Sequence, residues 1–379
     1  MTIALVNGRV VLPDGPRDGL CVVVDGPIIA SVSDKPLPSA SIVDLSGATL
    51  LPGFIDVQVN GGGGVLFNDE PNVAGIQAIG AAHRPFGTTG FLPTLISDDL
   101  DVVARAMAAV DKAIASGVPG VLGIHIEGPF LAGPRRGIHR ADKLRSLRDE
   151  DIAPLTSLKH GRTLLTVAPE AVTPAQIREL VAAGVVVALG HSAADYECTR
   201  AAFAAGARGV THLFNAMSGF AHRAPGMAGA TLENDDVFAG VIADGHHIHP
   251  AALRIALKAK GADRIMLVTD AMPSVGSDCS EFDLLGRRIR LSQGMLRDEA
   301  GTLAGSHLTM AGAFVDVMEQ AGVGFDEASR MASATPAAFL GLDDRIGSIV
   351  SGKQADFVIM DAGGRVLASW IAGVEQRFD

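Results

Sequence analysis

The hydrophobic residues follow two different patterns, which separate the ends of the chain from its central part. In the first fifty residues, short β-branched runs such as CVVVD alternate with Gly- and Pro-containing turns, and this pattern predicts strands. A similar pattern returns near the C-terminus in ADFVIMDAGGRVLASWIAG. We therefore expect residues 1–50 and 346–379 to pair and form one small β-sandwich domain.

The central part, residues 51–345, alternates short apolar runs with Ala-rich stretches that have helical periodicity. Apolar runs of this kind are typical of parallel strands that are buried on both faces. Strands are predicted at 54–60, 88–96, 121–128, 164–170, 185–192, 209–217, 237–245 and 265–272. Helices are predicted at 98–116, 173–184, 249–261, 309–321 and 326–339, and a hairpin insertion at 282–298. Eight such repeats favour an α/β fold of the (β/α)8 TIM-barrel type, although a doubly wound sheet has the same local pattern.

Composition and charge narrow the class of protein. The 379 residues include 31 basic and 42 acidic side chains, a net charge of −11, and no long basic run. This balance disfavours a cationic face for nucleic acid. Three cysteines favour a reducing compartment, so we expect a cytoplasmic protein. Neither a signal peptide nor a membrane-spanning run is evident.

Candidate chemistry gathers at the predicted strand ends, which meet at one mouth of a TIM barrel. A single histidine there is more often structural than functional. Glu127, His191 and His212, however, come from three different strands. One carboxylate and two imidazoles with a vacant fourth position are the ligands of a catalytic zinc. Asp270 ends the eighth strand, and it is either a base beside such a metal or a helix cap.

Two further signals are weaker. The run QVNGGGG at 58–64 lacks the spacing and the following helix of a phosphate-binding fingerprint, so a nucleotide loop is not expected. Arg223 follows a strand-end segment, THLFNAM. Its guanidinium either binds a phosphate through a bidentate fork or is an ordinary solvated charge.

Seven motifs together resemble the N-acetylglucosamine-6-phosphate deacetylase family of the amidohydrolase superfamily, over nearly the whole chain. They are PGFIDVQVNGGGG, GIHIEGPFL, LGHS, THLFNAM, ADGHHI, VTDAM and LAGSHLTM, in the family's order. The resemblance implies hydrolysis of the acetamide of N-acetyl-D-glucosamine 6-phosphate to D-glucosamine 6-phosphate and acetate, in amino-sugar catabolism and cell-wall recycling. It leaves a related substrate such as N-acetylgalactosamine 6-phosphate, or a non-catalytic binding scaffold, as alternatives.

The first strand departs from the pattern of most amidohydrolases, because Gln58 and Asn60 replace a His-x-His pair. A branch of the deacetylase family shares this replacement. The resemblance therefore implies one divalent metal per subunit, zinc before iron or another ion, held by Glu127, His191 and His212. Gln58 would contact the metal-bound water.

The resemblance also implies the remaining roles. Asp270 is expected to be the general base and then the acid, and His139 to hold the acetyl carbonyl. The residues expected to bind the sugar phosphate are Asn215, Ala216, His222, Arg223 and His247. The adjacent His246 is an alternative for the histidine of this motif, but the spacing of three residues from Asp244 favours His247. The family completes its site in a homodimer, where His222 or Arg223 can act across the interface.

Overall fold

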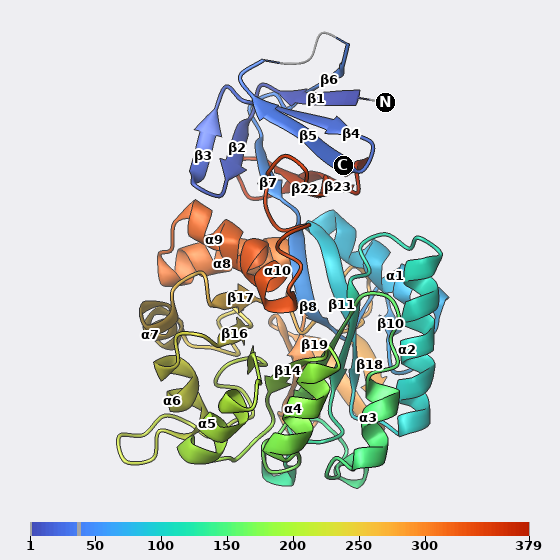
Figure 1. Cartoon of the computed structure of the whole chain (residues 1–379), viewed down its shortest axis with the longest axis vertical. Helices are drawn as coiled ribbons and strands as arrows, with labels where there is room; N and C mark the ends of the chain where they lie inside the picture. Colours follow the sequence, from blue (N-terminus) through green and yellow to red (C-terminus); the bar gives the residue numbers. More distant parts are fainter. Residues whose placement is uncertain (1, 36–38, 379) are drawn as a thin grey trace.

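The computed structural model describes residues 2–35 and 39–378, and it contains the predicted barrel (Figure 1). Eight strands form one parallel sheet in sequential order. They are β8 (Phe54–Val59), β11 (Thr88–Ile96), β12 (Gly123–Glu127), β13 (Arg162–Val167), β14 (Val186–Leu189), β15 (Gly209–Val210), β16 (Phe238–Val241) and β17 (Ile265–Leu267). All eight predicted strands are confirmed.

The barrel closes where its last strand returns to its first. A parallel bridge joins Val59 to Ala271, and the N–H of Asp270 donates to the carbonyl of Gln58 at 2.9 Å. Every residue of β8 and β11 is buried, as expected for strands covered on both faces. The seam therefore brings the end of β8 against the segment that follows β17.

Ten helices lie in the described ranges. They are α1 (Val73–His83), α2 (Leu100–Ala115), α3 (Asp149–Leu155), α4 (Pro174–Ala182), α5 (Tyr196–Ala204), α6 (Gly226–Glu233), α7 (Pro250–Lys260), α8 (Met310–Ala321), α9 (Phe325–Ala332) and α10 (Ala334–Leu340). Short 3-10 turns span Arg84–Phe86, Gly133–Arg135 and Ala141–Lys143. Local signals explain the ends: Thr173 forms a capping box with Gln176, and the N–H of Gly261 closes α7.

The prediction of a single helix over 326–339 is wrong. The chain breaks at Ser333, so that α9 and α10 are separate. Pro336 explains the break, because it lacks the N–H that would bond the carbonyl of Ala332, the last residue of α9.

Strands from both ends of the chain form a small β domain, which lies above the barrel and holds both termini in Figure 1. One sheet, in the order β5-β4-β1-β6, comes from the N-terminal region alone. The other, β24-β23-β22-β7-β2-β3, joins the two ends because β7 pairs antiparallel with β22, Leu51 opposite Val358. The expected pairing of the ends is confirmed. The strands are β1 (Thr2–Val6), β2 (Arg9–Leu12), β3 (Gly15–Asp18), β4 (Cys21–Asp25), β5 (Ile28–Ser33), β6 (Ser41–Asp44), β7 (Thr49–Pro52), β22 (Phe357–Met360), β23 (Val366–Ile371) and β24 (Val374–Arg377).

Two smaller sheets stand at the C-terminal side of the barrel strands. The Gly-rich run forms a short hairpin of β9 (Gly61–Gly62) and β10 (Val65–Leu66). The predicted hairpin insertion is larger than expected, a four-stranded antiparallel sheet. Its strands are β18 (Glu281–Leu284), β19 (Arg287–Ser292), β20 (Met295–Arg297) and β21 (Leu303–Ser306).

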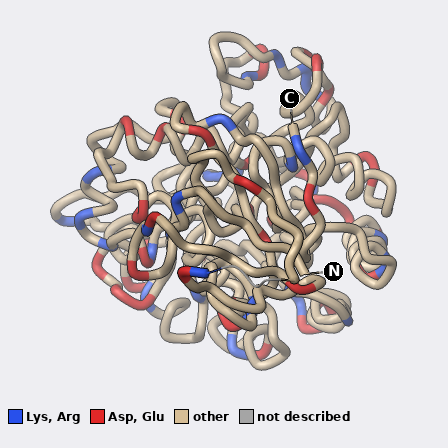
Figure 2. Tube along the Cα trace, turned by 90° about the horizontal axis from the view of Figure 1, so that it is seen from above, with Lys and Arg blue, Asp and Glu red and all other residues tan. Residues whose placement is uncertain are grey.

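The charged side chains are mixed over the surface (Figure 2), and the three cysteines are unpaired. Viewed from above in Figure 2, Lys and Arg alternate with Asp and Glu along the loops and do not gather on one side. Cys21, Cys198 and Cys279 are all free thiols. Among the described helices, none has the length and apolar character to cross a membrane.

Candidate metal centre and acid/base site

A cavity of about 530 Å³ opens at the C-terminal ends of the barrel strands. It collects most of the residues that the sequence singled out. Its lining includes Glu127, His139, His191, His212, Asn215, Ala216, His247 and Asp270. The barrel topology produces this gathering, because these residues lie at the C-terminal ends of β12, β14, β15, β16 and β17 or in the loops that follow them.

Three potential ligand atoms meet at the floor of this cavity. Glu127 Oε1 lies 3.0 Å from His191 Nε2 and 3.1 Å from His212 Nε2, and the two Nε2 atoms are 3.1 Å apart. All three side chains are buried. His191 and His212 both have positive φ, a left-handed conformation that costs about 1–3 kcal/mol where a side chain is present. The surrounding contacts must therefore hold both rings in place.

The donor set fits a divalent cation. Nδ1 of His191 donates to the carbonyl of Arg135 at 3.0 Å, and this bond orients the ring so that Nε2 faces the cluster. Burial works to raise the pKa of Glu127, but hydrogen bonds and charge from His191 and His212 outweigh it and hold that pKa well below its usual range. One carboxylate and two imidazoles that converge in this way are suited to zinc or a similar ion.

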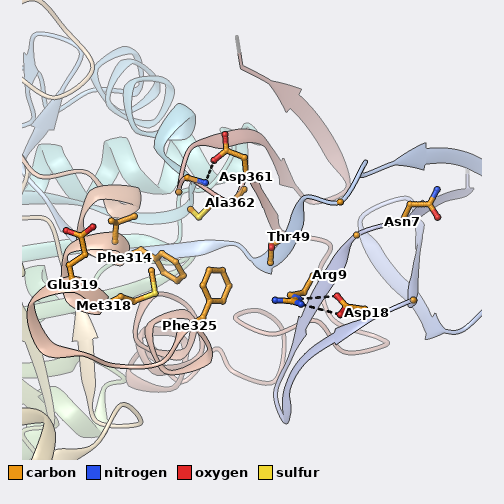
Figure 3. Close-up of a pocket in the computed structure, with 17 residues that line it drawn as sticks. Asn7, Arg9, Asp18, Thr49, Phe314, Met318, Glu319, Phe325, Asp361 and Ala362 are labelled. Atoms are coloured by element: carbon orange, nitrogen blue, oxygen red, sulfur yellow. Dashed lines mark hydrogen bonds and ion pairs between the residues drawn. The ribbon is translucent and has the colours of Figure 1, made fainter.

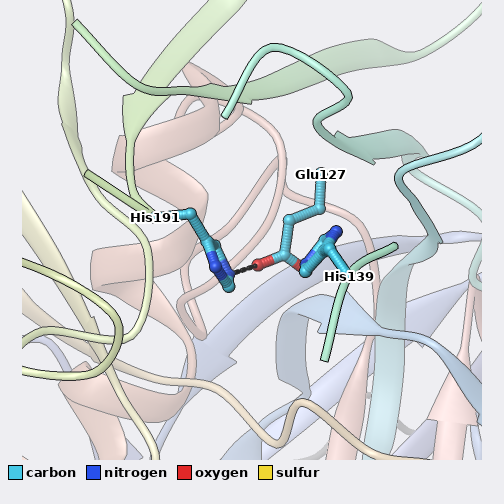
Figure 4. A group of neighbouring side chains, drawn as sticks. All are labelled: Glu127, His139 and His191. Atoms are coloured by element: carbon cyan, nitrogen blue, oxygen red, sulfur yellow. Dashed lines mark hydrogen bonds and ion pairs between the residues drawn. The ribbon is translucent and has the colours of Figure 1, made fainter. Parts of the chain in front are cut away.

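A second, overlapping set of potential ligands contains His139 in place of His212, with its atoms within 4.8 Å of one another (Figure 4). The set with His212 is the tighter one. His139 also has other partners, since its Nδ1 lies 2.7 Å from Ser97 Oγ and accepts from the Ser97 N–H at 3.3 Å. We therefore place His139 in the wall of the cavity, beside the cluster. Burial lowers the pKa of His139 to about 3, so the ring is neutral.

Asp270 lies beside the cluster and is held by the two residues that replace the His-x-His pair. Asn60 Nδ2 donates to Asp270 Oδ1 at 2.5 Å, and Gln58 Nε2 donates to the same oxygen at 3.1 Å. Gln58 Nε2 also reaches Glu127 Oε2 at 3.2 Å. Burial, with the charge of Glu127, raises the pKa of Asp270 to about 6. A carboxylate with such a pKa can both accept and return a proton near neutral pH.

The residues expected to bind the sugar phosphate divide into two groups. Asn215, Ala216 and His247 line the cavity, and His247 Nδ1 bonds Asp244 Oδ2 at 2.7 Å. His246 is not part of the lining. Arg223 and His222 are exposed on the loop before α6, outside the cavity of this chain.

Two arginines in the lining were missed by the sequence analysis. Arg135 precedes the GIH segment, and Arg297 belongs to β20 of the insertion. The pair Arg135-Arg136 beside the GIH motif was a usable signal. Arg297 had none, because a hairpin insertion gives no indication of which part of the barrel it covers.

A larger cavity of about 790 Å³ lies elsewhere, between the small β domain and helices α8 and α9 (Figure 3). Phe314, Met318 and Phe325 form an apolar wall, and an Arg9–Asp18 ion pair lies at its edge. No metal-ligand cluster lines it among the described residues. The chemistry therefore belongs to the smaller cavity.

Comparison with known proteins places this site in a family. Residues 49–378 match the amidohydrolase family. The chain belongs to the amidohydrolase family, a class of barrel enzymes.

Individual relatives within this family carry more specific names. The chain is 46% identical to an N-acetylgalactosamine-6-phosphate deacetylase of Shewanella sp. (strain ANA-3), over 87% of this chain and 83% of that protein. It is 34% identical to the N-acetylglucosamine-6-phosphate deacetylase of Haemophilus influenzae, over 98% and 99%. The crystal structure of N-acetylglucosamine-6-phosphate deacetylase from Pasteurella multocida superposes with a TM-score of 0.97 at 32% identity, over 100% of both chains.

Proposed function

We propose that this protein hydrolyses the acetamide of N-acetyl-D-glucosamine 6-phosphate to D-glucosamine 6-phosphate and acetate. The observation that carries the proposal is the placement of Asp270 in the same cavity as the convergent Glu127, His191 and His212. Amide hydrolysis requires an activated water, a polarised carbonyl and a proton for the departing nitrogen.

Glu127, His191 and His212 are the proposed ligands of one divalent metal, zinc before iron or another ion. When bound, the ion supplies Lewis-acid polarisation of the acetyl carbonyl and makes a coordinated water more acidic. Gln58 supports this arrangement because its amide contacts both Glu127 and Asp270.

Asp270 is the proposed base and then the acid. Both amide donors reach its Oδ1, and within the described residues Oδ2 has no hydrogen-bond partner. Oδ2 is therefore the oxygen available to take the proton of the attacking water. The same proton passes to the amine nitrogen as the C–N bond breaks, which leaves acetate and the free amino sugar.

His139 is the proposed donor to the acetyl carbonyl oxygen. The Ser97 N–H donates to its Nδ1, so that in the neutral ring the proton is on Nε2. An Nε2–H donor stabilises negative charge that develops on the carbonyl oxygen.

Asn215, Ala216 and His247 are the proposed contacts to the sugar phosphate from the same chain. Arg223 and His222 are exposed outside the cavity of their own chain, so we propose that they serve the site of a second subunit in a homodimer. The proposed compartment is the cytoplasm, because the three free cysteines suit a reducing environment.

The C4 epimer, N-acetylgalactosamine 6-phosphate, is the second candidate substrate. The specific observation in its favour is the 46% identity to a Shewanella protein that is named for this substrate. Acetate release from both epimers, measured with metal-loaded protein, tests the proposal, with unphosphorylated N-acetylglucosamine as the control. A kcat/KM that is higher for N-acetylglucosamine 6-phosphate supports the first candidate. A higher value for the epimer replaces it with the second, and no release from either contradicts both.

A further inference from the structure

Asp56 is a fully buried carboxylate beneath the site, and the proposed reaction does not use it. It belongs to β8 and does not line the cavity. Its Oδ1 accepts from the N–H groups of Gln58 at 3.1 Å and Thr269 at 3.2 Å, and its Oδ2 accepts from the Thr269 hydroxyl at 2.5 Å. No basic side chain of the described chain pairs with it. Burying a carboxylate without a cation costs free energy, so the hydrogen bonds that Asp56 accepts must offset this cost.

These partners connect the seam of the barrel to Asp270. The Thr269 hydroxyl donates to Asp56 and accepts from the N–H of Ala271 at 3.2 Å. The N–H of Asp270, between them, donates to the carbonyl of Gln58 at 2.9 Å. All three N–H groups of the 269–271 segment therefore bond to β8 or to the threonine that Asp56 holds.

The carbonyl groups of the same segment are held from the other side. Ser306, at the end of β21, donates its hydroxyl to the carbonyl of Thr269 at 2.5 Å and its N–H to the carbonyl of Asp270 at 2.9 Å. The N–H groups of Asn60 and Gly61 both donate to the carbonyl of Ala271 at 2.9 Å. Every backbone polar group from residue 269 to residue 271 thus has a partner.

This bonding coincides with an unfavourable backbone conformation. Asp270 has a φ of 53°, in the left-handed region that side chains rarely adopt. Such a residue keeps this conformation only where the surrounding structure enforces it. We propose that Asp56 is a positioning residue, which acts through Thr269 to hold the backbone of Asp270 so that its carboxylate faces the metal cluster.

The expected loss of activity rests on the proposed function, whereas the expected effect on the backbone of Asp270 does not. If the hydroxyl link is removed, the Asp270 carboxylate is free to shift, while Glu127, His191 and His212 keep their own supports. A displacement of about 1 Å at a reacting group can lower the rate by about 100-fold. We therefore expect kcat to fall while KM and bound metal stay near their wild-type values.

The test compares two substitutions at one position with a matched control. Thr269→Val preserves the branched shape and removes the hydroxyl, and we expect it to lower kcat by about 10- to 100-fold. Thr269→Ser keeps the hydroxyl and is expected to restore most of the activity. Thr231→Val is the control, because Thr231 is also fully buried and donates to the Met227 carbonyl at 2.8 Å in α6. It should lower the melting temperature by a similar amount without changing kcat.

Asp56→Leu tests the aspartate itself. Leucine has a similar size but accepts no hydrogen bond, so the N–H groups of Gln58 and Thr269 and the Thr269 hydroxyl lose their acceptor. We expect kcat to fall by about 10- to 100-fold, as in Thr269→Val, and an unchanged kcat in a folded Asp56→Leu would overturn the inference. If Thr269→Val does not fold, Ser306→Ala takes its place. This variant removes the hydroxyl donor to the Thr269 carbonyl, and we expect the same loss of kcat.

Hydrogen–deuterium exchange supplies a measurement that does not depend on turnover. In Thr269→Val we expect faster exchange in peptides that cover 265–275, and unchanged exchange around Glu127 and His191. Unchanged kcat with a melting temperature lowered as in Thr231→Val overturns the inference, as does unchanged exchange over 265–275. If wild type releases no acetate from either sugar phosphate, the proposed function fails, and the exchange experiment alone still decides whether Asp56 and Thr269 hold the segment.

Discussion

The floor of the cavity differs from the exposed loop before α6 in how its polar side chains are held. This loop, called the rim below, carries His222 and Arg223 and lies outside the cavity of its own chain. On the floor, Glu127, His191, His212 and Asp270 are buried or lie deep in the barrel mouth, and each contacts another of the site residues. On the rim, Arg223 and His222 are exposed and make no ion pair among the described residues. The floor is thus preorganised within one chain, whereas the part that we propose for Arg223 and His222 depends on the proposed homodimer.

This difference suggests that the floor and the rim have different roles in the proposed reaction. Groups that transfer protons or hold a metal must be fixed within a fraction of an ångström, and burial in a barrel achieves this. A phosphate can be bound by long, flexible cations, because its role is to hold the substrate. Substitutions on the floor should therefore abolish chemistry, and substitutions on the rim should weaken binding.

Loss of a proposed metal ligand should have the largest effect. We expect His212→Ala to bind far less than one metal per chain and to lose acetate release entirely, because two ligands leave the ion weakly held. His160→Ala, a surface substitution, is the control and should retain both metal and activity. Metal content by elemental analysis, measured beside the deacetylation rate, checks the prediction. Full activity in His212→Ala would exclude His212 as a ligand and favour the alternative cluster with His139.

Asp270→Asn should separate proton transfer from metal binding. The amide cannot accept the proton of the attacking water, and loss of a general acid/base typically costs about 10²- to 10⁴-fold in rate. We expect kcat to fall by that factor while about one metal per chain remains, as in the wild type. Two metals per chain in either protein would contradict the interpretation of Gln58 and Asn60 as replacements for a metal-binding pair.

The floor was also the part that the sequence predicted best. Glu127 ends β12, and His191 and His212 follow the ends of β14 and β15 by two residues. The periodicity located these strands within a few residues, so barrel topology alone brought the three side chains together. Asp56 and Arg297 were not identifiable in this way. A buried aspartate in an apolar strand has no periodic signal, and the position of Arg297 depends on how the insertion sheet folds back over the mouth. Pro336 did carry a signal, and the continuous helix over 326–339 was predicted in spite of it.

On the rim, Arg223→Ala should weaken substrate binding by a smaller factor. A charge-assisted hydrogen bond contributes about 1.5–3 kcal/mol, so KM for the phosphorylated sugar should rise by about 10- to 100-fold with kcat nearly unchanged. The rate with unphosphorylated N-acetylglucosamine should not change. Arg200→Ala, on the exposed side of α5, is the control. An equal loss for both sugars would show that Arg223 does not recognise the phosphate.

The smallest expected effect concerns stability and one buried histidine, His83. His83 is fully buried under the β9–β10 hairpin, where Nε2 lies 2.9 Å from the carbonyl of Gly61, and burial lowers the pKa of His83 to about 4. The unfolded chain takes up this proton near pH 6.5, so the stabilisation is complete above pH 6.5 and is lost as the pH falls toward 4. Between pH 7.5 and pH 5 this amounts to about 2 kcal/mol. His83→Gln keeps a donor for Gly61 without a titrating group, so its free energy of unfolding should fall less over that range, as measured by urea denaturation. A loss equal to that of the wild type would show that other groups, and not His83, set the acid sensitivity.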